Sequence, residues 1–432
     1  MPTKVKKKTG AGIKAVDTSV LKKFLKRYEN HCAQCQSIAS PTITQALKKC
    51  IQNGSSYLKI ILSCPGNPSD SSASVLLRPL LMTIRDERYM LGTDLCLWGI
   101  SVSNQDVASL AILLELSGRT SYPFVKLEAI DCGMDVWSVE RLGKAIRCSQ
   151  LTSVTLDYNE FKDEGIQGLV HGLEENTKVV TLSLCYCKLG PSSGALLGKV
   201  LAESAVSELY LTGNYLQCSG AVDLIASIAD YAQDLATERP PEQPFDLAHQ
   251  ILEAQGQTGI STAISGDLEI SERPATSPNR PAEHKKSKKR GRKGTKKAAL
   301  PPGPWVTKLH LADNGIDAMG EKKETGVLEF SQLLSSLIRY SEQLSELDLD
   351  NNCLGEMPAT DILEALTSRN QAEYVQLFEN DITLKSLHVK GKLPRLKIKV
   401  TAQISSITFK AILKQSKKLK VSKKKKKRKK KN

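Results

Sequence analysis

The chain contains 432 residues, 61 of them Lys or Arg and 46 Asp or Glu, and no apolar run approaches the ~20 residues of a membrane-spanning helix. Its eleven cysteines, with no apolar stretch behind the basic N-terminus, favour reduced thiols in cytosol or nucleus over a secreted disulfide scaffold. The net charge of +15 arises from three acid-free basic runs, at 4–8, 285–297 and 417–431. These runs hold 25 of the 61 basic residues. The rest of the chain therefore has 36 basic and 46 acidic residues, a net charge of about −10. Polyanion binding is therefore expected of the runs alone.

The N-terminal region is predicted to start with a disordered basic segment, residues 1–17, followed by a helical cap over 18–78. Two helices separated by a Ser-Pro break are expected there, and the apolar residues of the first share one face: Leu21, Phe24, Leu25 and Tyr28. A strand-like piece at 57–63 is predicted as a degenerate first repeat, whose leucines the cap would hide from water.

Residues 79–230 repeat one pattern of a short strand, a turn and a helix. The clearest copy has its marker residues at Leu151, Val154, Leu156, Asn159, Phe161, Gly165, Leu169 and Leu173. The strand leucines alternate, and the helix leucines four residues apart share one face. One turn position recurs every 27 or 28 residues and is predicted to hydrogen-bond the turn backbone, at Cys132, Asn159, Cys187 and Asn214. Since one unit cannot bury its own leucines, the units are expected to stack. Gly165 and Gly220 are expected to open their helices through tight turns.

The pattern is interrupted after its fifth unit. Residues 231–304 are rich in Pro, Glu, Gln, Ser and Thr and nearly lack aromatic residues, which predicts a disordered insertion ending in a basic cluster. Two further units follow within 305–392, with another strand-like piece at 384–389. Because the chain leaves after a helix and returns at a strand, the units on either side are expected to stack directly and hide their leucine faces.

The C-terminal region divides into two parts. Residues 393–414 alternate apolar residues with lysine and are predicted as a strand-like cap that closes the sheet edge, through Leu396, Ile398 and Val400. Residues 415–432 form a lysine-rich tail, which is expected to be a solvated, disordered polycation.

The leucine spacing and the alternating Cys and Asn of the turns resemble the ribonuclease-inhibitor subfamily of leucine-rich repeat proteins, over 91–230 and 305–366. The resemblance implies an α/β solenoid shaped as a horseshoe, with parallel strands on the concave face and helices on the convex face. It does not define a partner, because family members bind different ones. The interruption, and a sixth unit stretched around the sequence EKKETG, depart from the family's regular spacing.

The strand residues between the leucines are predicted to line the concave face and to bind a protein partner. Tyrosine and tryptophan with carboxylates are an interface-like composition, although ordinary polar surface would look similar. The candidates are Trp98, Asp157, Tyr158, Tyr186, Tyr210, His310, Asp313, Asp348 and Asp350.

The basic runs are candidates for polyanion binding, through Lys285, Lys286, Lys288, Lys289, Arg290, Arg292, Lys293, Lys423, Lys424, Lys425, Lys426, Lys427 and Arg428. Three interpretations stay open: nuclear import signals, RNA contact, or contact with acidic protein tails such as those of tubulin. Because the runs contain no aromatic residue to stack on bases, electrostatic tethering is better supported than sequence-specific RNA recognition.

The sequence offers no catalytic constellation, so we expect a non-enzymatic chain without cofactor, small-molecule substrate or membrane partner. The six histidines are scattered, and no phosphate-binding glycine loop is present. Cys32 and Cys35, preceded by His31, have the spacing of zinc ligands. A structural zinc site needs four ligands, and no second close pair follows, so packing is favoured over metal binding.

Two functional hypotheses follow. The first is a protein-binding scaffold of the ciliary or flagellar axoneme. The combination of a helical N-terminal extension, an acidic repeat array and lysine-rich segments resembles that of repeat proteins in cilia and flagella. Its basic runs would contact tubulin or a microtubule-associated complex. The second is a nuclear or nucleolar repeat protein, whose basic runs serve import and RNA contact while the array binds a protein.

Overall fold

The structure is a computed structural model. It describes residues 18–64, 74–116, 121–238, 306–317, 323–378, 396–400 and 405–416. The chain divides into two compact units, one made of 1–236 with 299–432 and the other of 237–298. All the strands and helices below belong to the first unit, apart from the last two residues of α8. The polybasic runs and the piece at 384–389 lie outside the described residues. So do the predicted disordered segments, except 231–238 and 415–416, which are helical and not disordered.

Nine parallel strands form a single sheet in chain order, each paired with the next. They are β1 (Lys59–Ser63), β2 (Asp94–Trp98), β3 (Lys126–Ile130), β4 (Ser153–Thr155), β5 (Thr181–Ser183), β6 (Glu208–Tyr210), β7 (Lys308–His310), β8 (Glu346–Asp348) and β9 (Lys397–Lys399). The predicted α/β architecture of stacked strand–helix units is therefore confirmed, and the C-terminal strand predicted within 393–414 pairs with β8.

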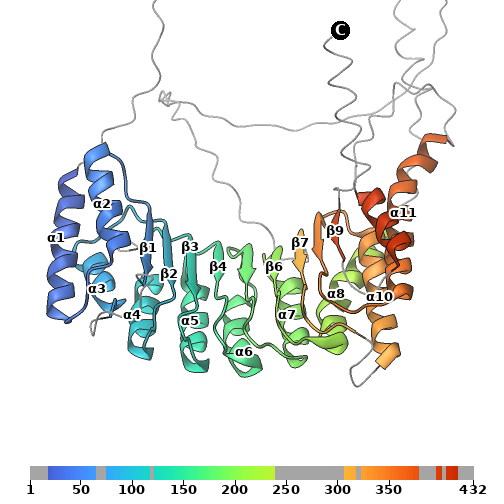
Figure 1. Ribbon diagram of the computed structural model, residues 1–432, viewed down its shortest axis with the longest axis horizontal. Coiled ribbons are helices and arrows are strands. Elements are labelled where there is room, and N and C mark those ends of the chain that lie inside the picture. Colours follow the sequence, from blue (N-terminus) through green and yellow to red (C-terminus); the bar gives the residue numbers. More distant parts are fainter. Residues whose placement is uncertain are drawn as a thin grey trace, which may run out of the picture. The chain divides into compact units, whose positions relative to one another are not determined.

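Helices alternate with the strands. They are α1 (Thr18–Gln34), α2 (Pro41–Asn53), α3 (Arg78–Asp86), α4 (Asn104–Glu115), α5 (Val136–Cys148), α6 (Lys162–Leu173), α7 (Ser192–Glu203), α8 (Gln217–Glu238), α10 (Lys323–Tyr340) and α11 (Glu356–Phe378). A further helical stretch covers 406–416, so the strand-like structure predicted for 393–414 is wrong over 406–414. Helices α4 to α7 follow one another along the same side of the strands (Figure 1).

The core lies between the sheet and this helical layer. Equivalent strand positions stack in register and are at most 1% exposed, at Leu127, Val154, Leu182, Leu209, Leu309 and Leu347. Burying one such side chain contributes about 2 kcal/mol. No unit could bury its leucines alone, so the stacking of units creates the core, as predicted.

The turn position predicted to form a ladder does so, and Asn214, which is 2% exposed, shows how. Its Oδ1 accepts hydrogen bonds from the backbone N–H groups of Cys187 at 3.0 Å and Leu189 at 3.1 Å. Its Nδ2 donates to the backbone carbonyls of Leu184 and Leu211, both at 2.8 Å. One side chain thereby joins two successive units and satisfies four buried backbone groups.

Asparagine and cysteine share this ladder in different ways. Asn159 and Asn352 make the same four kinds of contact as Asn214. The thiols of Cys132 and Cys187 donate instead to one carbonyl of the preceding unit, at 3.4 and 3.3 Å. Burial raises the pKa of Cys132 to about 12, so the thiol keeps the proton that it donates.

The repeats on either side of the insertion stack directly, as predicted. Strand β6 pairs with β7, with Glu208 opposite Lys308 and Tyr210 opposite His310. The ladder also crosses this junction, because Nδ2 of Asn314 donates to the Leu211 carbonyl at 2.9 Å. Helix α8, however, continues to Glu238, so the first eight residues of the predicted insertion, 231–238, are helical.

Glycines allow neighbouring helices to touch through their backbones. A Cβ atom on Gly172 of α6 would lie 1.9 Å from the Gly143 carbonyl oxygen of α5, and one on Gly194 of α7 would lie 2.1 Å from that of Gly220. The expectation that Gly165 and Gly220 open their helices through tight turns is wrong. Neither has a left-handed φ. Both sit in the first turn of a helix, where a Cβ would meet Phe161 at 2.7 Å or Pro191 at 2.8 Å.

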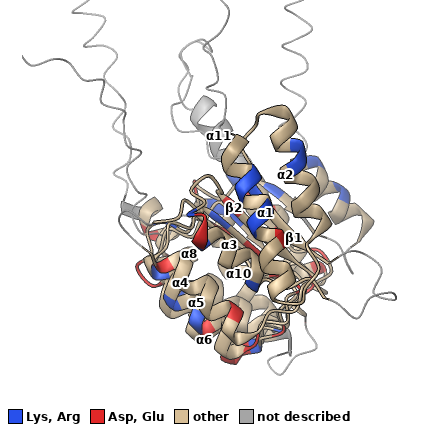
Figure 2. Cartoon of the chain, turned by 90° about the vertical axis from the view of Figure 1, so that its left-hand side faces the viewer, with Lys and Arg blue, Asp and Glu red and all other residues tan. Residues whose placement is uncertain are grey.

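The N-terminal cap packs around His31, which is 4% exposed. Nδ1 lies 3.0 Å from Oγ1 of Thr83, and Nε2 lies 3.3 Å from a carboxylate oxygen of Asp86. Because the Thr83 hydroxyl donates to the Pro79 carbonyl at 2.7 Å, it accepts from Nδ1–H. Cys32 is buried beside this histidine, in the packing role favoured above. Lys and Arg positions recur along α1 and α2 (Figure 2).

Arg369 of α11 closes the end of α10 and is 6% exposed. Its guanidinium donates to the carbonyls of Ile338 at 2.6 Å, Ser341 at 2.8 Å and Leu344 at 3.4 Å. Burial lowers its pKa to about 10, which still leaves the group charged at neutral pH. The cation sits where the helix dipole of α10 is negative.

Replacing Arg369 by Met should lower the free energy of unfolding of the C-terminal units by about 3 kcal/mol, because three buried carbonyls lose their donor. Hydrogen exchange measured by mass spectrometry should show the loss in α10 and α11. Arg27→Met is the control, since that side chain is 51% exposed in its pair with Glu87 and should change stability by no more than about 0.5 kcal/mol. Equal effects of the two substitutions would contradict the capping role.

Candidate protein-binding surface

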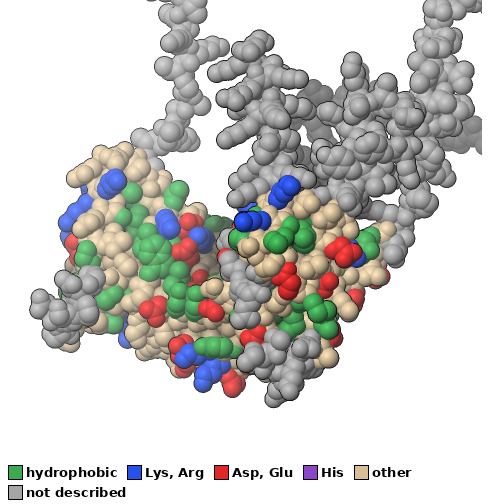
Figure 3. All heavy atoms as spheres, turned by 45° about the vertical axis from the view of Figure 1, so that its right-hand side comes forward, with side chains coloured by type: hydrophobic (Ala, Val, Ile, Leu, Met, Phe, Trp, Pro, Cys, Tyr) green, Lys and Arg blue, Asp and Glu red, His purple; other side chains and the backbone are tan. Residues whose placement is uncertain are grey.

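The strand side chains that alternate with the core leucines point away from helices α4 to α7. We call the surface that they form on β2 to β8 the open face. It includes the predicted residues Trp98, Asp157, Tyr210, His310, Asp348 and Asp350. Tyr158, Tyr186 and Asp313 lie in the turns that follow the strands, each directly before the ladder residue of its unit. The predicted residues therefore occupy two adjoining strips, one on the strands and one in the turns. On the side of the molecule that Figure 3 shows, apolar and acidic side chains are interspersed.

At the N-terminal end of the open face, Trp98 belongs to a polar network. Its Nε1 donates to Glu128 at 2.9 Å, and the ammonium of Lys59 lies 5.4 Å from its ring centroid. Glu128 also pairs with Lys126 on its own strand. Cys96 lies fully buried between these groups. The indole is thus held in one position by a hydrogen bond and a cation–π contact.

The charges of this network shift the pKa values of its members. Burial raises the pKa of the Glu128 carboxyl, but hydrogen bonds from Lys126, Cys96 and Trp98 outweigh it, so the net pKa is lowered. Burial and the neighbouring carboxylate raise the pKa of Cys96 to about 12, which leaves an unreactive thiol. Sequence reasoning missed Glu128, although its register opposite Cys96 would place it on this face.

Asp157 lies in the middle of the open face and is tied down by its neighbours. Its Oδ1 accepts from the Ser183 hydroxyl at 2.7 Å and from the Cys185 backbone N–H at 2.9 Å. Burial raises its pKa more than these hydrogen bonds lower it, and the charge of Glu128 adds to the rise. This carboxylate is therefore a positioned acceptor between two units rather than a freely exposed charge.

The Tyr158 and Tyr186 rings stack with their centroids 4.7 Å apart and their planes 9° from parallel. Both residues are accessible, at 52% and 39% exposure. Both also adopt left-handed backbone conformations, with φ of 60° and 57°. That conformation costs an L-residue other than Gly, Asn or Asp about 1–2 kcal/mol. Two exposed aromatic rings are thus kept together at the cost of backbone strain.

The C-terminal part of the open face carries alternating charges. Lys308 pairs with Glu208 at 2.8 Å, and the Tyr210 hydroxyl lies 3.4 Å from the same carboxylate. The ring of His310 lies 4.6 Å from that of Tyr210 and within 4 Å of a carboxylate oxygen of Asp348. Three of the predicted residues therefore meet in one row across β6, β7 and β8.

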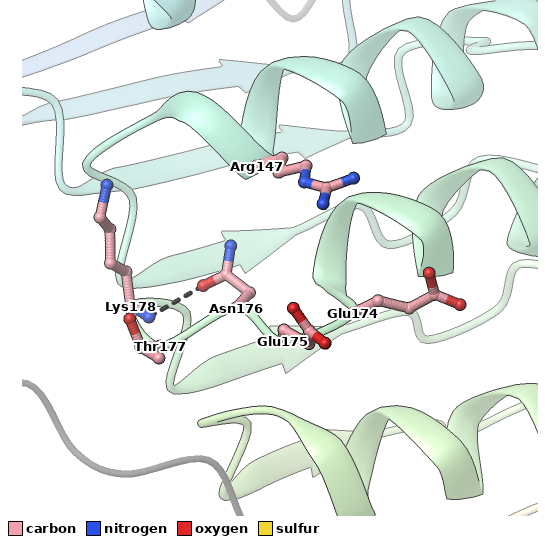
Figure 4. Close-up of a pocket in the computed structure, with 6 residues that line it drawn as sticks. All are labelled: Arg147, Glu174, Glu175, Asn176, Thr177 and Lys178. Atoms are coloured by element: carbon pink, nitrogen blue, oxygen red, sulfur yellow. Dashed lines mark hydrogen bonds between the residues drawn. The ribbon is translucent and has the colours of Figure 1, made fainter.

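A small pocket lies elsewhere, at the turn between α6 and β5 (Figure 4). Arg147 reaches it from α5, and the turn supplies the residues 174–178. Oδ1 of Asn176 accepts from the backbone N–H groups of Lys178 at 2.8 Å and Val179 at 2.9 Å, and the Lys178 ammonium donates to the Ser149 carbonyl at 2.7 Å. These hydrogen bonds stabilise the turn. The positions of the Asn176 and Lys178 side chains are therefore explained by the fold itself, with no need for a ligand.

The other predicted sites are placed as follows. The polyanion-binding candidates at 285–293 and 423–428 lie outside the described residues. Within the described ranges, no three His, Cys, Asp or Glu side chains gather in a way that could hold a metal ion. Of the helices in the described part of the chain, none combines the length and apolar character needed to cross a membrane.

Comparison with protein-family models finds no match to the chain, and comparison with curated proteins finds none either.

Proposed function

We propose that the chain is a leucine-rich repeat protein of the ribonuclease-inhibitor type, with the open face as the concave side of a horseshoe. Nine parallel strands in chain order, repeating at 27 or 28 residues in the central units, support this assignment. The Asn and Cys ladder supports it further, because the same turn atoms are bound in unit after unit. A solenoid of this kind offers an extended surface for a macromolecule.

We further propose that the chain is a scaffold whose open face binds a protein partner. The observation that carries this proposal is the set of aromatic side chains held in fixed positions on this face and along its edge, Trp98 by Glu128 and Tyr158 by Tyr186. Fixed aromatic residues lose little conformational entropy on binding, and Trp and Tyr are enriched among residues that dominate interface energies. The strand leucines are already used in the core, so the binding capacity of each strand lies in its outward side chains.

Photo-crosslinking can test the binding face. A photoreactive amino acid at Thr212, on the open face, should yield one adduct of defined mass in cells, whereas the same amino acid at Gln167, exposed on α6, should not. Trp98→Ala or Tyr210→Ala should lower the adduct yield at a given partner concentration, because losing an aromatic anchor weakens binding by about tenfold or more. An adduct formed only from Gln167 would place the partner on the helical side and sink the proposal.

In the cell, we propose a structural place on the ciliary or flagellar axoneme, with the basic runs against acidic tails such as those of tubulin. The 25 basic residues of the three acid-free runs support electrostatic tethering of this kind. Imaging in ciliated cells should show axonemal signal that weakens when the twelve basic residues of 417–431 are replaced by Gln, a change that keeps the chain length. Nucleolar signal lost in the same variant would favour the import and RNA hypothesis instead.

A further inference from the structure

One turn position forms a continuous row along the edge of the open face. It is the residue before each ladder position, and in five successive units it is Asp131, Tyr158, Tyr186, Gly213 and Asp313. All five have a positive φ, between 53° and 75°. Each donates its backbone N–H to a carbonyl of the next unit, at 2.8–3.0 Å. The row is therefore rigid, and its side chains project from neighbouring units at fixed spacing.

The residue types in this row do not all fit its backbone. Glycine and aspartate tolerate the left-handed conformation, whereas tyrosine does so rarely. The ring of Tyr186 lies over Gly213, where a Cβ would come within 2.2 Å of it, so a larger residue at Gly213 would displace the ring. The aromatic pair thus occupies strained positions with space kept for it, which is the pattern expected when strain is tied to function.

The charge around the pair is acidic. Asp131 precedes Tyr158 in the row and Asp313 follows Gly213, and both aspartates are exposed. The lysine next to this row, Lys188, is already paired with Glu160. Asp313 lies close enough for its charge to contribute, after burial and the charge of Tyr158, to a raised pKa of the Tyr186 hydroxyl. A ligand here would meet two stacked rings flanked by carboxylates.

We propose that Tyr158 and Tyr186, flanked by Asp131 and Asp313, bind an arginine-rich segment of the protein partner. A guanidinium is planar and weakly hydrated, so it stacks on an aromatic face while it donates to a carboxylate beside it. Lysine is a compact, strongly hydrated charge and gains less from such a surface. This inference rests on the proposed function, because it names the chemistry of the partner on that same face.

Single-stranded nucleic acid is the competing occupant, since bases also stack on tyrosine. The flanking aspartates argue against it, because binding of nucleic acid depends on cations that neutralise the phosphates. The carboxylates that would repel a phosphate backbone are the groups that would hold a guanidinium.

Fluorescence anisotropy on the full chain tests the proposal with labelled oligo-arginine and oligo-lysine peptides of equal length. The basic runs of the chain repel both peptides alike, so the ratio of the two dissociation constants isolates the aromatic contribution. The wild-type chain should bind oligo-arginine about tenfold more tightly than oligo-lysine. The double variant Tyr158→Asn, Tyr186→Asn should lose that preference. Tyr215→Asn is the matched control, because Tyr215 is 60% exposed but has no left-handed φ, and the preference should remain.

Asparagine accepts the left-handed conformation, so the double variant should unfold at the same temperature as the wild type or a higher one. If the double variant loses the preference for oligo-arginine but keeps its unfolding temperature, the effect is on binding and not on folding. Equal affinity of the wild type for the two peptides would overturn the proposal, and so would a double variant that instead loses affinity for oligo-uridine. Neither result would affect crosslinking at Thr212, so the arginine-binding inference can fail while the protein-binding function stands.

Discussion

Asn214→Ala is expected to lower the free energy of unfolding by about 4 kcal/mol. The substitution removes four hydrogen bonds and leaves the N–H groups of Cys187 and Leu189 buried without an acceptor. Each unsatisfied group costs about 1–3 kcal/mol, and at 2% exposure water cannot replace the lost partner. Urea denaturation followed by circular dichroism measures the total. Hydrogen exchange should localise the loss to β5, β6 and the turns that follow them.

Two further variants show whether the ladder causes this loss. Asn214→Cys should cost about half as much, because a thiol at this position still donates to one carbonyl, as Cys187 does at 3.3 Å. Tyr215→Ala, at the neighbouring exposed residue, should change stability by no more than about 0.5 kcal/mol. If Ala and Cys at position 214 were equally destabilising, the carbonyl contacts would contribute nothing, and that account of the ladder would be wrong.

Gly172→Ala is expected to destabilise the protein by about 2 kcal/mol or more, although alanine is the better helix former. The new Cβ would lie 1.9 Å from the Gly143 carbonyl oxygen and 2.5 Å from its carbon, so α5 and α6 must move apart. Both neighbours are backbone atoms of regular helices and cannot rotate away. Thermal unfolding measured by calorimetry gives the change in stability.

The same substitution at other close contacts provides a graded control. A Cβ at Gly194 would meet the Gly220 oxygen at 2.1 Å, and one at Gly198 would meet the Asp223 oxygen at 2.8 Å. The destabilisation should therefore fall in the order Gly172→Ala, Gly194→Ala, Gly198→Ala. Stabilisation by about 1 kcal/mol at all three sites would mean that helix propensity alone acts and that these helices do not touch through their backbones.

The order of strands, turns and helices was predictable because each unit marks its own parts. Leucines alternating around Val154, followed by Asn159 in the turn, define a strand and its end without any long-range information. The end of α8 was not predictable in this way. The residues after 230 lack the leucine pattern, yet Ala232 packs at 6% exposure and the helix continues to Glu238. A small apolar residue can extend a helix on a packed surface where the repeat pattern gives no signal.

The residues of the candidate surface were predictable from the sequence, but the contacts between their side chains were not. Tyr158 and Tyr186 follow from the repeat spacing, whereas their stacking depends on a left-handed backbone that tyrosine seldom adopts. Glu128 was missed because a glutamate on a strand resembles ordinary surface. Its role appears only from its 2.9 Å hydrogen bond to the indole of Trp98, which lies on another strand.

The junction between β6 and β7 has a consequence for how the chain can be divided. Thr307 donates its backbone N–H to the Ser207 carbonyl at 2.7 Å, although 100 residues separate them. The contacts at this junction are made by strand pairing, the ladder and buried leucines, and none of them requires a peptide bond between 238 and 306. A chain cut in that interval, or supplied as two polypeptides, contains all the groups that the junction uses. The two halves could then reassemble by complementation, and a protease acting there would leave a nicked but associated molecule.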